Sequence, residues 1–111
     1  MTLTIIKAII VAEAMRQGFD PNIALAVAKV ESNYNVHATG KVGEIGLYQI
    51  KPRFAHISKQ ELFNAKKNAK EGIRQLIFWK KRCGEYYLAC YNGGKRGMYL
   101  KRYTQKVASA L

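Results

Sequence analysis

The chain has 111 residues, the size of one compact domain. Hydrophobic residues make up 49% of it, and its two prolines and nine glycines are scattered, which excludes a disordered chain or a linker. A formal net charge of +12 favours polyanionic partners, such as nucleic acid, anionic lipid or an anionic cell-wall polymer, without selecting among them.

The first predicted element is a helix from Leu3 to Gln17, where apolar residues recur at helical spacing and Gly18 supplies the stop. The segment from Met1 to Val11 has no basic n-region, carries Lys7 among its apolar residues and is not followed by a small-residue cleavage site. We therefore interpret it as a core helix and not as a signal peptide. No apolar run approaches the roughly 20 residues of a membrane span.

The second predicted helix begins at Asp20 and Pro21, an N-cap followed by proline at the first helical position. Residues 23–30 are apolar on nearly every side, which predicts a buried central helix that ends at Glu31. Residues 32–46 are rich in Ser, Asn, Thr and Gly, so we expect a loop or small hairpin after this helix.

Further helices are predicted in the second half of the chain. Residues 58–61 fit a capping box for a short helical turn, and Asn64 caps a longer helix that ends near Gly84. Gly72 inside this helix indicates a close helix crossing. A short helix follows over residues 85–91, closed by residues 92–94. The last helix is outlined by Tyr99, Leu100, Tyr103, Val107 and Leu111.

Strand-like alternation is nearly absent, so the predicted fold class is all-α, with five or six helices around the central helix and one domain over residues 1–111. His37 and His56 are isolated, and we expect neither a metal nor a cofactor. On a continuous helix Cys83 and Cys90 would lie about 10 Å apart, beyond disulfide reach. A bridge would require a sharp turn at Gly84, and the sequence leaves their redox state open.

Glu31 is a candidate general acid because of its position. Burial and the negative end of the helix dipole both disfavour a charged carboxyl at the last turn of an apolar helix, so its pKa should be raised. Protonation of a glycosidic oxygen near neutral pH requires such a group. Position alone fits better a glutamate that simply emerges into solvent where the helix ends.

Four short segments follow one another in a characteristic order. They are Glu31-Ser32, Gly43-Glu44-Ile45-Gly46-Leu47-Tyr48-Gln49-Ile50, Ala89-Cys90-Tyr91-Asn92-Gly93-Gly94 and Tyr103-Thr104-Gln105-Lys106-Val107. Together they resemble the SLT-type lytic transglycosylases of the lysozyme superfamily, with their Glu-Ser pair, Gly-Leu-Met-Gln-type segment, Ala-Tyr-Asn segment and late Tyr-x-x-x-Val. The resemblance covers residues 20–107, and the stretch from Leu62 to Gly72, with Asn68 inside it, matches a further family segment. Each motif is weak alone, but their order and spacing are specific.

The resemblance implies a role for each matched residue. Glu31 is the acid/base, Ser32 helps to hold the helix end, Tyr48 and Gln49 face the sugar groove, Tyr91 and Asn92 contact substrate, and Tyr103 hydrogen-bonds Glu31. Each of these polar groups also has a structural alternative: Gln49 and Asn92 as residues that only tie loop backbone, and Tyr91 as a core residue.

Three positions depart from the family pattern. Tyr48 replaces the Met, a change that we expect to be benign because an aromatic face can stack on a sugar. Gly40 stands where a Ser is frequent. Glu44 replaces an Ala and adds a second carboxyl near the loop, and two carboxylates flanking the bond are what an ordinary glycoside hydrolase uses.

The implied reaction is cleavage of the β-1,4 bond between N-acetylmuramic acid and N-acetylglucosamine in peptidoglycan, without water. Glu31 acts first as acid and then as base, with help from the substrate's N-acetyl group, and the product is a 1,6-anhydro ring. The first alternative is a hydrolytic muramidase that uses Glu44 as second carboxyl.

Two further alternatives belong to other classes. One is a basic helical nucleic-acid-binding module, whose surface would be residues 95–102 interleaved with Tyr99 and Tyr103. The other is an inactive wall-binding domain, against which the intact Glu31 and Gln49 argue. We expect a monomer that acts on glycan strands in the cell wall or periplasm and has no specific nucleic-acid partner. Without a signal peptide, we expect virion delivery, release through a membrane lesion or export within a larger protein, and the small size favours a phage enzyme.

Overall fold

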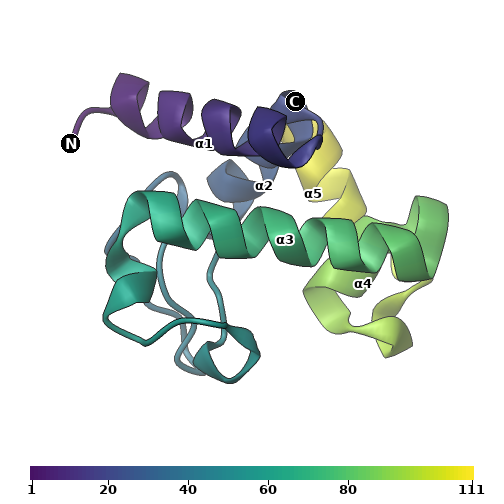
Figure 1. Cartoon of the computed structure of the whole chain (residues 1–111). Coiled ribbons are helices and arrows are strands. Elements are labelled where there is room, and N and C mark those ends of the chain that lie inside the picture. Colours follow the sequence, from purple (N-terminus) through teal and green to yellow (C-terminus); the bar gives the residue numbers. More distant parts are fainter.

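The computed structural model describes all 111 residues and contains five α-helices (Figure 1). They are α1 (Leu3–Gln17), α2 (Pro21–Ser32), α3 (Ala65–Cys83), α4 (Tyr87–Gly93) and α5 (Arg102–Ala110). Short 3-10 turns occur at Pro52–Phe54, Glu61–Phe63, Gly84–Tyr86 and Lys95–Gly97. The only β pairing is two isolated antiparallel bridges, Thr39 with Ile45 and Ile45 with Ile50. The predicted all-α class, with a small hairpin-like loop after the second helix, is therefore confirmed.

The predicted caps define the ends of the first three helices. Gly18, in the left-handed conformation with φ 74°, closes α1. The side chain of Asp20 accepts a hydrogen bond from the backbone N–H of Asn22 at the start of α2, and that of Asn64 accepts one from Lys67 at the start of α3. Helix α2 ends at Ser32, one residue later than predicted.

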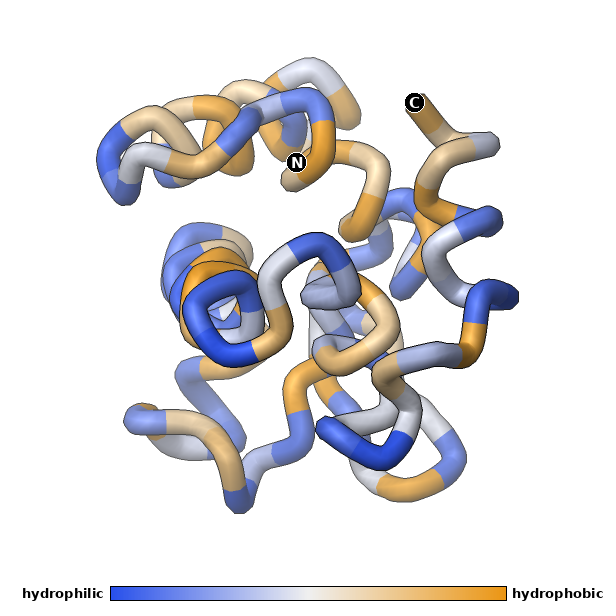
Figure 2. The backbone as a smooth tube through the Cα atoms, turned by 90° about the vertical axis from the view of Figure 1, so that its right-hand side faces the viewer, coloured by the Kyte–Doolittle hydropathy of each residue, from blue (hydrophilic) through white to orange (hydrophobic).

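Helix α2 contributes a fully buried face to the core. Its residues Ala24, Val27 and Ala28 have no exposed surface. Helices α1 and α5 both pack against α2, and α1 also lies along α3 (Figure 1). In Figure 2, hydrophilic residues occupy the outer side of α3, which leaves its apolar residues for the interior. The predicted burial of this helix is thus confirmed for one of its faces, and its last turn brings Glu31 out at the edge of the core. None of the helices combines the length and apolar character that a membrane crossing requires.

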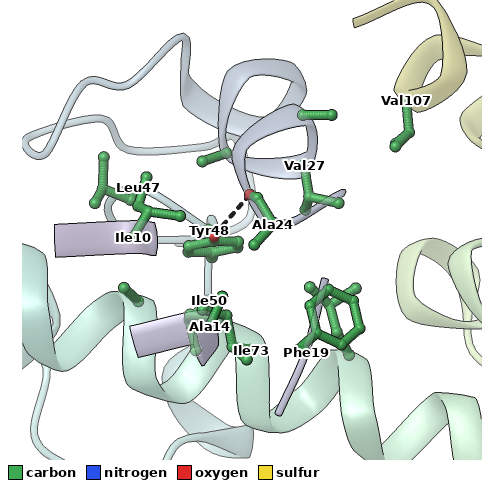
Figure 3. Close-up of a cluster of buried hydrophobic side chains, with 14 of the residues drawn as sticks. Ile10, Ala14, Phe19, Ala24, Val27, Leu47, Tyr48, Ile50, Ile73 and Val107 are labelled. Atoms are coloured by element: carbon green, nitrogen blue, oxygen red, sulfur yellow. Dashed lines mark hydrogen bonds between the residues drawn. The ribbon is translucent and has the colours of Figure 1, made fainter. Parts of the chain in front are cut away.

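The glycine inside α3 makes room for a side chain and not for another helix. A Cβ atom at Gly72 would overlap the ring of Tyr48, which comes from the loop after α2. Tyr48 is only 1% exposed, and its hydroxyl donates a 2.7 Å hydrogen bond to the carbonyl of Ala24 (Figure 3). The prediction of a close helix crossing at Gly72 is therefore wrong.

The last two helices differ from the prediction in their boundaries. The segment predicted as one helix from Glu85 begins as a 3-10 turn, and α4 starts at Tyr87. Helix α5 begins at Arg102, so Tyr99 and Leu100 precede it, and they are 71% and 70% exposed. The two residues were assigned to this helix because they extend its apolar pattern in the sequence. In the structure neither side chain packs into the core.

The two cysteines form a disulfide bond. Helix α3 ends at Cys83, and the chain turns at Gly84, whose φ is 54°. This turn places Cys83 and Cys90 with their Cα atoms 6.8 Å apart. The continuous-helix estimate was wrong because no helix runs through Gly84, and the alternative with a sharp turn is the one observed.

We expect the double variant Cys83→Ser/Cys90→Ser to lose about 2–3 kcal/mol of unfolding free energy, because the open chain has more conformational freedom when unfolded. Thermal unfolding with and without reductant measures this effect. Reductant should bring the wild type to the melting temperature of the variant and leave the variant unchanged. A wild type that melts at the same temperature in both conditions would contradict the expectation.

Candidate active site

A cleft of about 540 Å³ lies over the end of α2. Four parts of the chain line it: the last turn of α2, the loop that follows, the middle of α3, and α4. The lining residues include Glu31, Glu44, Gln49, Lys51, Arg53, Phe54, Arg74, Phe78, Trp79, Tyr91 and Asn92. The cleft therefore brings together most of the residues that the sequence singled out, from positions far apart in the chain.

Glu31 lies partly buried in this cleft, and the hydroxyl of Tyr103 in α5 donates a hydrogen bond to its Oε2 atom. Burial raises the pKa of Glu31 above its usual value. The hydrogen bond from Tyr103 opposes that rise, the nearby carboxylate of Glu44 adds to it, and Lys106 opposes it. Both the raised pKa and the contact with Tyr103 are as predicted. A carboxyl in this setting holds its proton to higher pH than an exposed glutamate.

Ser32 anchors the end of α2 and does not line the cleft. Its hydroxyl lies 2.8 Å from the carbonyl of Leu47 and 3.2 Å from that of Ala28, and its one hydrogen is shared between these two acceptors. The implied role in holding the helix end thus agrees with the structure. As a substrate-binding residue Ser32 is misplaced, because its hydroxyl is engaged with backbone.

The side chains of the sequence neighbours Tyr48 and Gln49 have different surroundings. Tyr48 lines the cleft, as predicted, but its ring is buried against Gly72, so the expectation that the ring stacks on a sugar is wrong. The tyrosine is longer than the methionine of the family pattern, and its hydroxyl finds a partner deep in the core. Gln49 does line the cleft, and its Nε2 atom donates to the carbonyls of Ala38 and Gly46 at 3.2 and 2.9 Å. It therefore shapes the loop as well as facing the cleft.

Helix α4 presents Tyr91 and Asn92 to the cleft. The hydroxyl of Tyr91 donates 3.2 Å to the carbonyl of Tyr48, and its ring centre lies 6.3 Å from that of Tyr103. Burial raises the pKa of the Tyr91 hydroxyl, and the charge of Glu31 raises it further, so the phenol stays neutral. Tyr91 thus joins the core to the cleft, while Asn92 is exposed at its edge.

Glu44 and Gly40, two departures from the family pattern, are neighbours in space. The carboxylate of Glu44 accepts a 3.0 Å hydrogen bond from the backbone N–H of Val42. A Cβ atom at Gly40 would overlap this carboxylate and lie 2.9 Å from Oε1 of Gln49. The absent side chain at position 40 therefore makes room for the second carboxyl, which lines the same cleft as Glu31.

Asn68 holds the loop that carries Gln49, a role that the sequence did not reveal. Its side chain is 1% exposed and makes three hydrogen bonds with the backbone of this region. Oδ1 accepts from the N–H of Tyr48 at 2.8 Å, and Nδ2 donates to the carbonyls of Ile45 and Leu62 at 2.8 and 2.9 Å. One buried amide thereby fixes the loop to α3.

Sequence reasoning also missed the aromatic residues that line the cleft. Phe78 and Trp79 of α3 meet edge to face with ring centres 5.2 Å apart. Phe54 lies in the 3-10 turn Pro52–Phe54. No motif marks these residues. The one available signal was the aromatic pair Phe78 and Trp79 beside the apolar stripe of α3. Helical periodicity assigns such residues only to the core or to solvent and does not indicate a cleft. No three His, Cys, Asp or Glu side chains lie close enough together to hold a metal ion.

The family model of the transglycosylase SLT domain matches residues 8–109. This chain belongs to the SLT family. Among solved structures, the crystal structure of the 70 kDa soluble lytic transglycosylase from Escherichia coli is similar, with a TM-score of 0.67 and 22% sequence identity. The match covers 84% of this SLT domain and 17% of that protein, and it shows a shared lysozyme-like, all-α fold. No curated protein sequence matches the chain.

The contact between Tyr103 and Glu31 leads to a test within the SLT domain. We expect Tyr103→Phe to raise the pKa of Glu31 further, because the lost hydroxyl stabilised the carboxylate. NMR titration of the Glu31 side-chain carboxyl measures the change directly. Tyr34→Phe is a matched control, since that hydroxyl donates to the carbonyl of Leu25, outside the cleft. An unchanged or lowered pKa in Tyr103→Phe would contradict the expectation.

Proposed function

We propose that this SLT domain is a peptidoglycan lytic transglycosylase that leaves 1,6-anhydromuramic acid ends. It cleaves the β-1,4 bond between N-acetylmuramic acid and N-acetylglucosamine. The observation that carries the proposal is the environment of Glu31. A carboxyl with a raised pKa lies in a cleft at the end of a buried helix, and Tyr103 holds it. Membership of the SLT family supports the substrate class.

The reaction uses Glu31 twice. Its proton passes to the leaving glycosidic oxygen as the bond to C1 of the muramic ring breaks, and the N-acetyl carbonyl oxygen bonds to C1 from the other side. The C6 hydroxyl then displaces that oxygen at C1, and its proton returns to the Glu31 carboxylate. Tyr103 donates a hydrogen bond to the carboxylate during the interval in which Glu31 is charged.

The remaining residues bind or position the substrate. Gln49 and Asn92 line the cleft and can hydrogen-bond the N-acetyl and hydroxyl groups of the sugars. Tyr91 lines the cleft and lies next to Tyr103, the partner of Glu31. Ser32 and Tyr48 act indirectly, by holding the end of α2 and the loop in place.

A hydrolytic muramidase is the second candidate, and the position of Glu44 favours it. Glu44 lines the same cleft as Glu31, so its carboxylate could activate a water molecule that attacks C1 in place of the C6 hydroxyl. One oxygen of this carboxylate accepts a hydrogen bond from the backbone N–H of Val42, and the carboxylate packs against Gly40 of the same loop. Its position in the cleft makes Glu44 a candidate second carboxyl, and the products of the reaction reveal whether it acts as one.

The products of purified peptidoglycan distinguish the two reactions. Mass spectrometry should find muropeptides with anhydro ends, which are one water lighter than the reducing ends that hydrolysis leaves. Glu44→Gln should keep making the same anhydro products. Reducing ends as the main product, together with inactivity of Glu44→Gln, would replace the transglycosylase with the muramidase.

The nucleic-acid alternative loses part of its surface in this fold. Tyr103, one of the two aromatic residues expected to stack on bases, is buried and bonded to Glu31. We propose that the domain acts as a monomer on glycan strands in the cell wall or periplasm. DNA binding that is tight at physiological salt and unaffected by Glu31→Gln would argue for the alternative.

A further inference from the structure

Helix α4 carries two residues of the cleft, Tyr91 and Asn92, but has few restraints of its own. It has only seven residues, and no side chain caps its start. A helix of this length is unstable by itself in water, because too few hydrogen bonds offset the cost of nucleation. A single hydrogen bond joins its side chains to another part of the chain, from the hydroxyl of Tyr91 to the carbonyl of Tyr48 at 3.2 Å. The position of α4 therefore depends on how it is attached to the rest of the domain.

The disulfide bond is the covalent attachment of α4 to α3. Cys83 is the last residue of α3, a helix of 19 residues that carries the fully buried Ile73 and Leu76. Cys90 is buried in the middle of α4, borders the cleft and directly precedes Tyr91. Between the two cysteines the chain runs through the exposed turn at residues 84–86. The bond thus fastens α4 to a long helix of the core at the residue next to Tyr91.

Tyr91 in turn affects the surroundings of Glu31. Its ring centre lies 6.3 Å from that of Tyr103, whose hydroxyl donates a hydrogen bond to Glu31. The charge of Glu31 helps to raise the pKa of the Tyr91 hydroxyl, so the two groups are close. The other ionisable groups that act on this carboxylate are Tyr103 and Lys106 of α5 and Glu44 of the loop. Burial is the largest cause of the raised pKa of Glu31, so a displaced α4 would admit water and lower that pKa.

We propose that the bond between Cys83 and Cys90 positions α4 for catalysis, so that the domain reaches full activity only after the two thiols have been oxidised. This inference rests on the proposed function. Without the bond, α4 keeps its apolar contacts and the domain stays folded, but Tyr91 and Asn92 are held less closely and water reaches Glu31. In a reducing compartment such as the cytoplasm, the enzyme is therefore folded and weakly active. Oxidation outside that compartment completes the site.

The oxidation is a thiol–disulfide exchange with a disulfide-bearing oxidant such as glutathione disulfide. The thiolate of one cysteine attacks a sulfur of the oxidant, forms a mixed disulfide and releases one thiolate. The thiolate of the second cysteine then displaces the other half of the oxidant, and the bond between Cys83 and Cys90 forms. The two cysteines lose two protons and two electrons, which the oxidant takes up as it becomes two thiols. Because Cys83 is 5% exposed and Cys90 has no exposed surface, the exchange takes place while α4 is undocked.

A bond that only stabilised the fold would leave the activity of the folded enzyme unchanged, so the test is made where every enzyme is folded. The enzymes are the oxidised wild type, the wild type reduced while unfolded and refolded with free thiols, and Cys83→Ala/Cys90→Ala. Ile6→Ala is the control, because it opens a cavity under α1 and lowers stability outside the cleft. Circular dichroism defines a temperature at which all four are folded.

We expect the reduced wild type and the double cysteine variant to lose about 10- to 100-fold in kcat/KM on soluble glycan strands, the scale of a small misplacement of positioning residues. Glutathione disulfide should restore the activity of the reduced wild type and leave the double variant unchanged. NMR should show a lower pKa of Glu31 and faster amide exchange at residues 87–93 in both. Ile6→Ala should show neither change and should keep the activity of the wild type.

Three results would overturn the proposal. These are reduced enzymes as active as the oxidised wild type, an equal loss of activity in Ile6→Ala, and an unchanged Glu31 pKa with unchanged exchange in α4. An oxidised wild type that cleaves no glycan strand would instead refute the proposed transglycosylase activity. The pKa of Glu31 and the exchange in α4 then still decide whether the bond positions the site, so the two failures can be told apart.

Discussion

Glu31→Gln should reduce peptidoglycan cleavage by about 10²–10⁴-fold, the range contributed by a positioned general acid or base. The variant keeps the shape of the side chain and an oxygen that accepts from Tyr103, but its amide has no acidic proton to transfer to the glycosidic oxygen. Release of muropeptides from purified peptidoglycan measures the loss. Glu85→Gln, an exposed glutamate outside the cleft, provides the matched control. Activity of Glu31→Gln within a few-fold of the wild type would remove Glu31 from the mechanism.

The same variant has an expected signature in stability. Because the pKa of Glu31 is raised by folding, the folded protein binds more protons than the unfolded chain above the unfolded pKa of about 4.3. The wild type therefore loses stability as pH rises from there through the folded pKa. Glu31→Gln has no such group, so its melting temperature relative to the wild type should rise between pH 4 and pH 7. Loss of activity together with this rise excludes misfolding as the cause.

Asn68→Leu is expected to cost at least about 3 kcal/mol of unfolding free energy. The change leaves the N–H of Tyr48 and the carbonyls of Ile45 and Leu62 buried without partners, at about 1–3 kcal/mol each. Such a loss is a large part of the stability of a domain of this size. Urea denaturation measures it.

A second asparagine on the same helix is the control for Asn68. Asn64→Ala removes the exposed N-cap of α3 and should cost about 1 kcal/mol. Asn68→Ala, with less bulk near Gly46, should still cost more than Asn64→Ala, because the same three backbone groups lose their partner. An equal loss of unfolding free energy in Asn68→Ala and Asn64→Ala would show that Asn68 does not hold the loop against α3.

The fold was predictable where local chemistry determines it. The ends of α1, α2 and α3 coincide with caps that the residues themselves specify, at Gly18, Asp20 and Asn64. The predictions that failed concern features that depend on residues far apart in the sequence. The disulfide needed the direction of the chain after Gly84, and the burial of Tyr48 needed the space above Gly72, which no local pattern encodes.

The site was predictable only in part, for a similar reason. Glu31 was suggested by its position on an apolar helix, and its link to Tyr103, 72 residues away, came from the resemblance to the SLT family. The cationic and aromatic side of the cleft carries no motif. Residues such as Arg53 and Phe78 look like ordinary surface positions until α3 and the 3-10 turn are placed side by side.

The close fit between Gly40 and Glu44 couples the two positions. A Cβ atom at position 40 would overlap the carboxylate of Glu44 and lie 2.9 Å from Oε1 of Gln49, and both groups stand at the flexible ends of their side chains. A Gly40→Ser variant should therefore displace the carboxylate from its present site and disturb Gln49 beside it, while the backbone of the loop stays in place. In a chain that already carries Glu44→Ala, the same change at position 40 would meet only Gln49. The two positions should therefore be epistatic, because the effect of a substitution at one depends on the residue at the other.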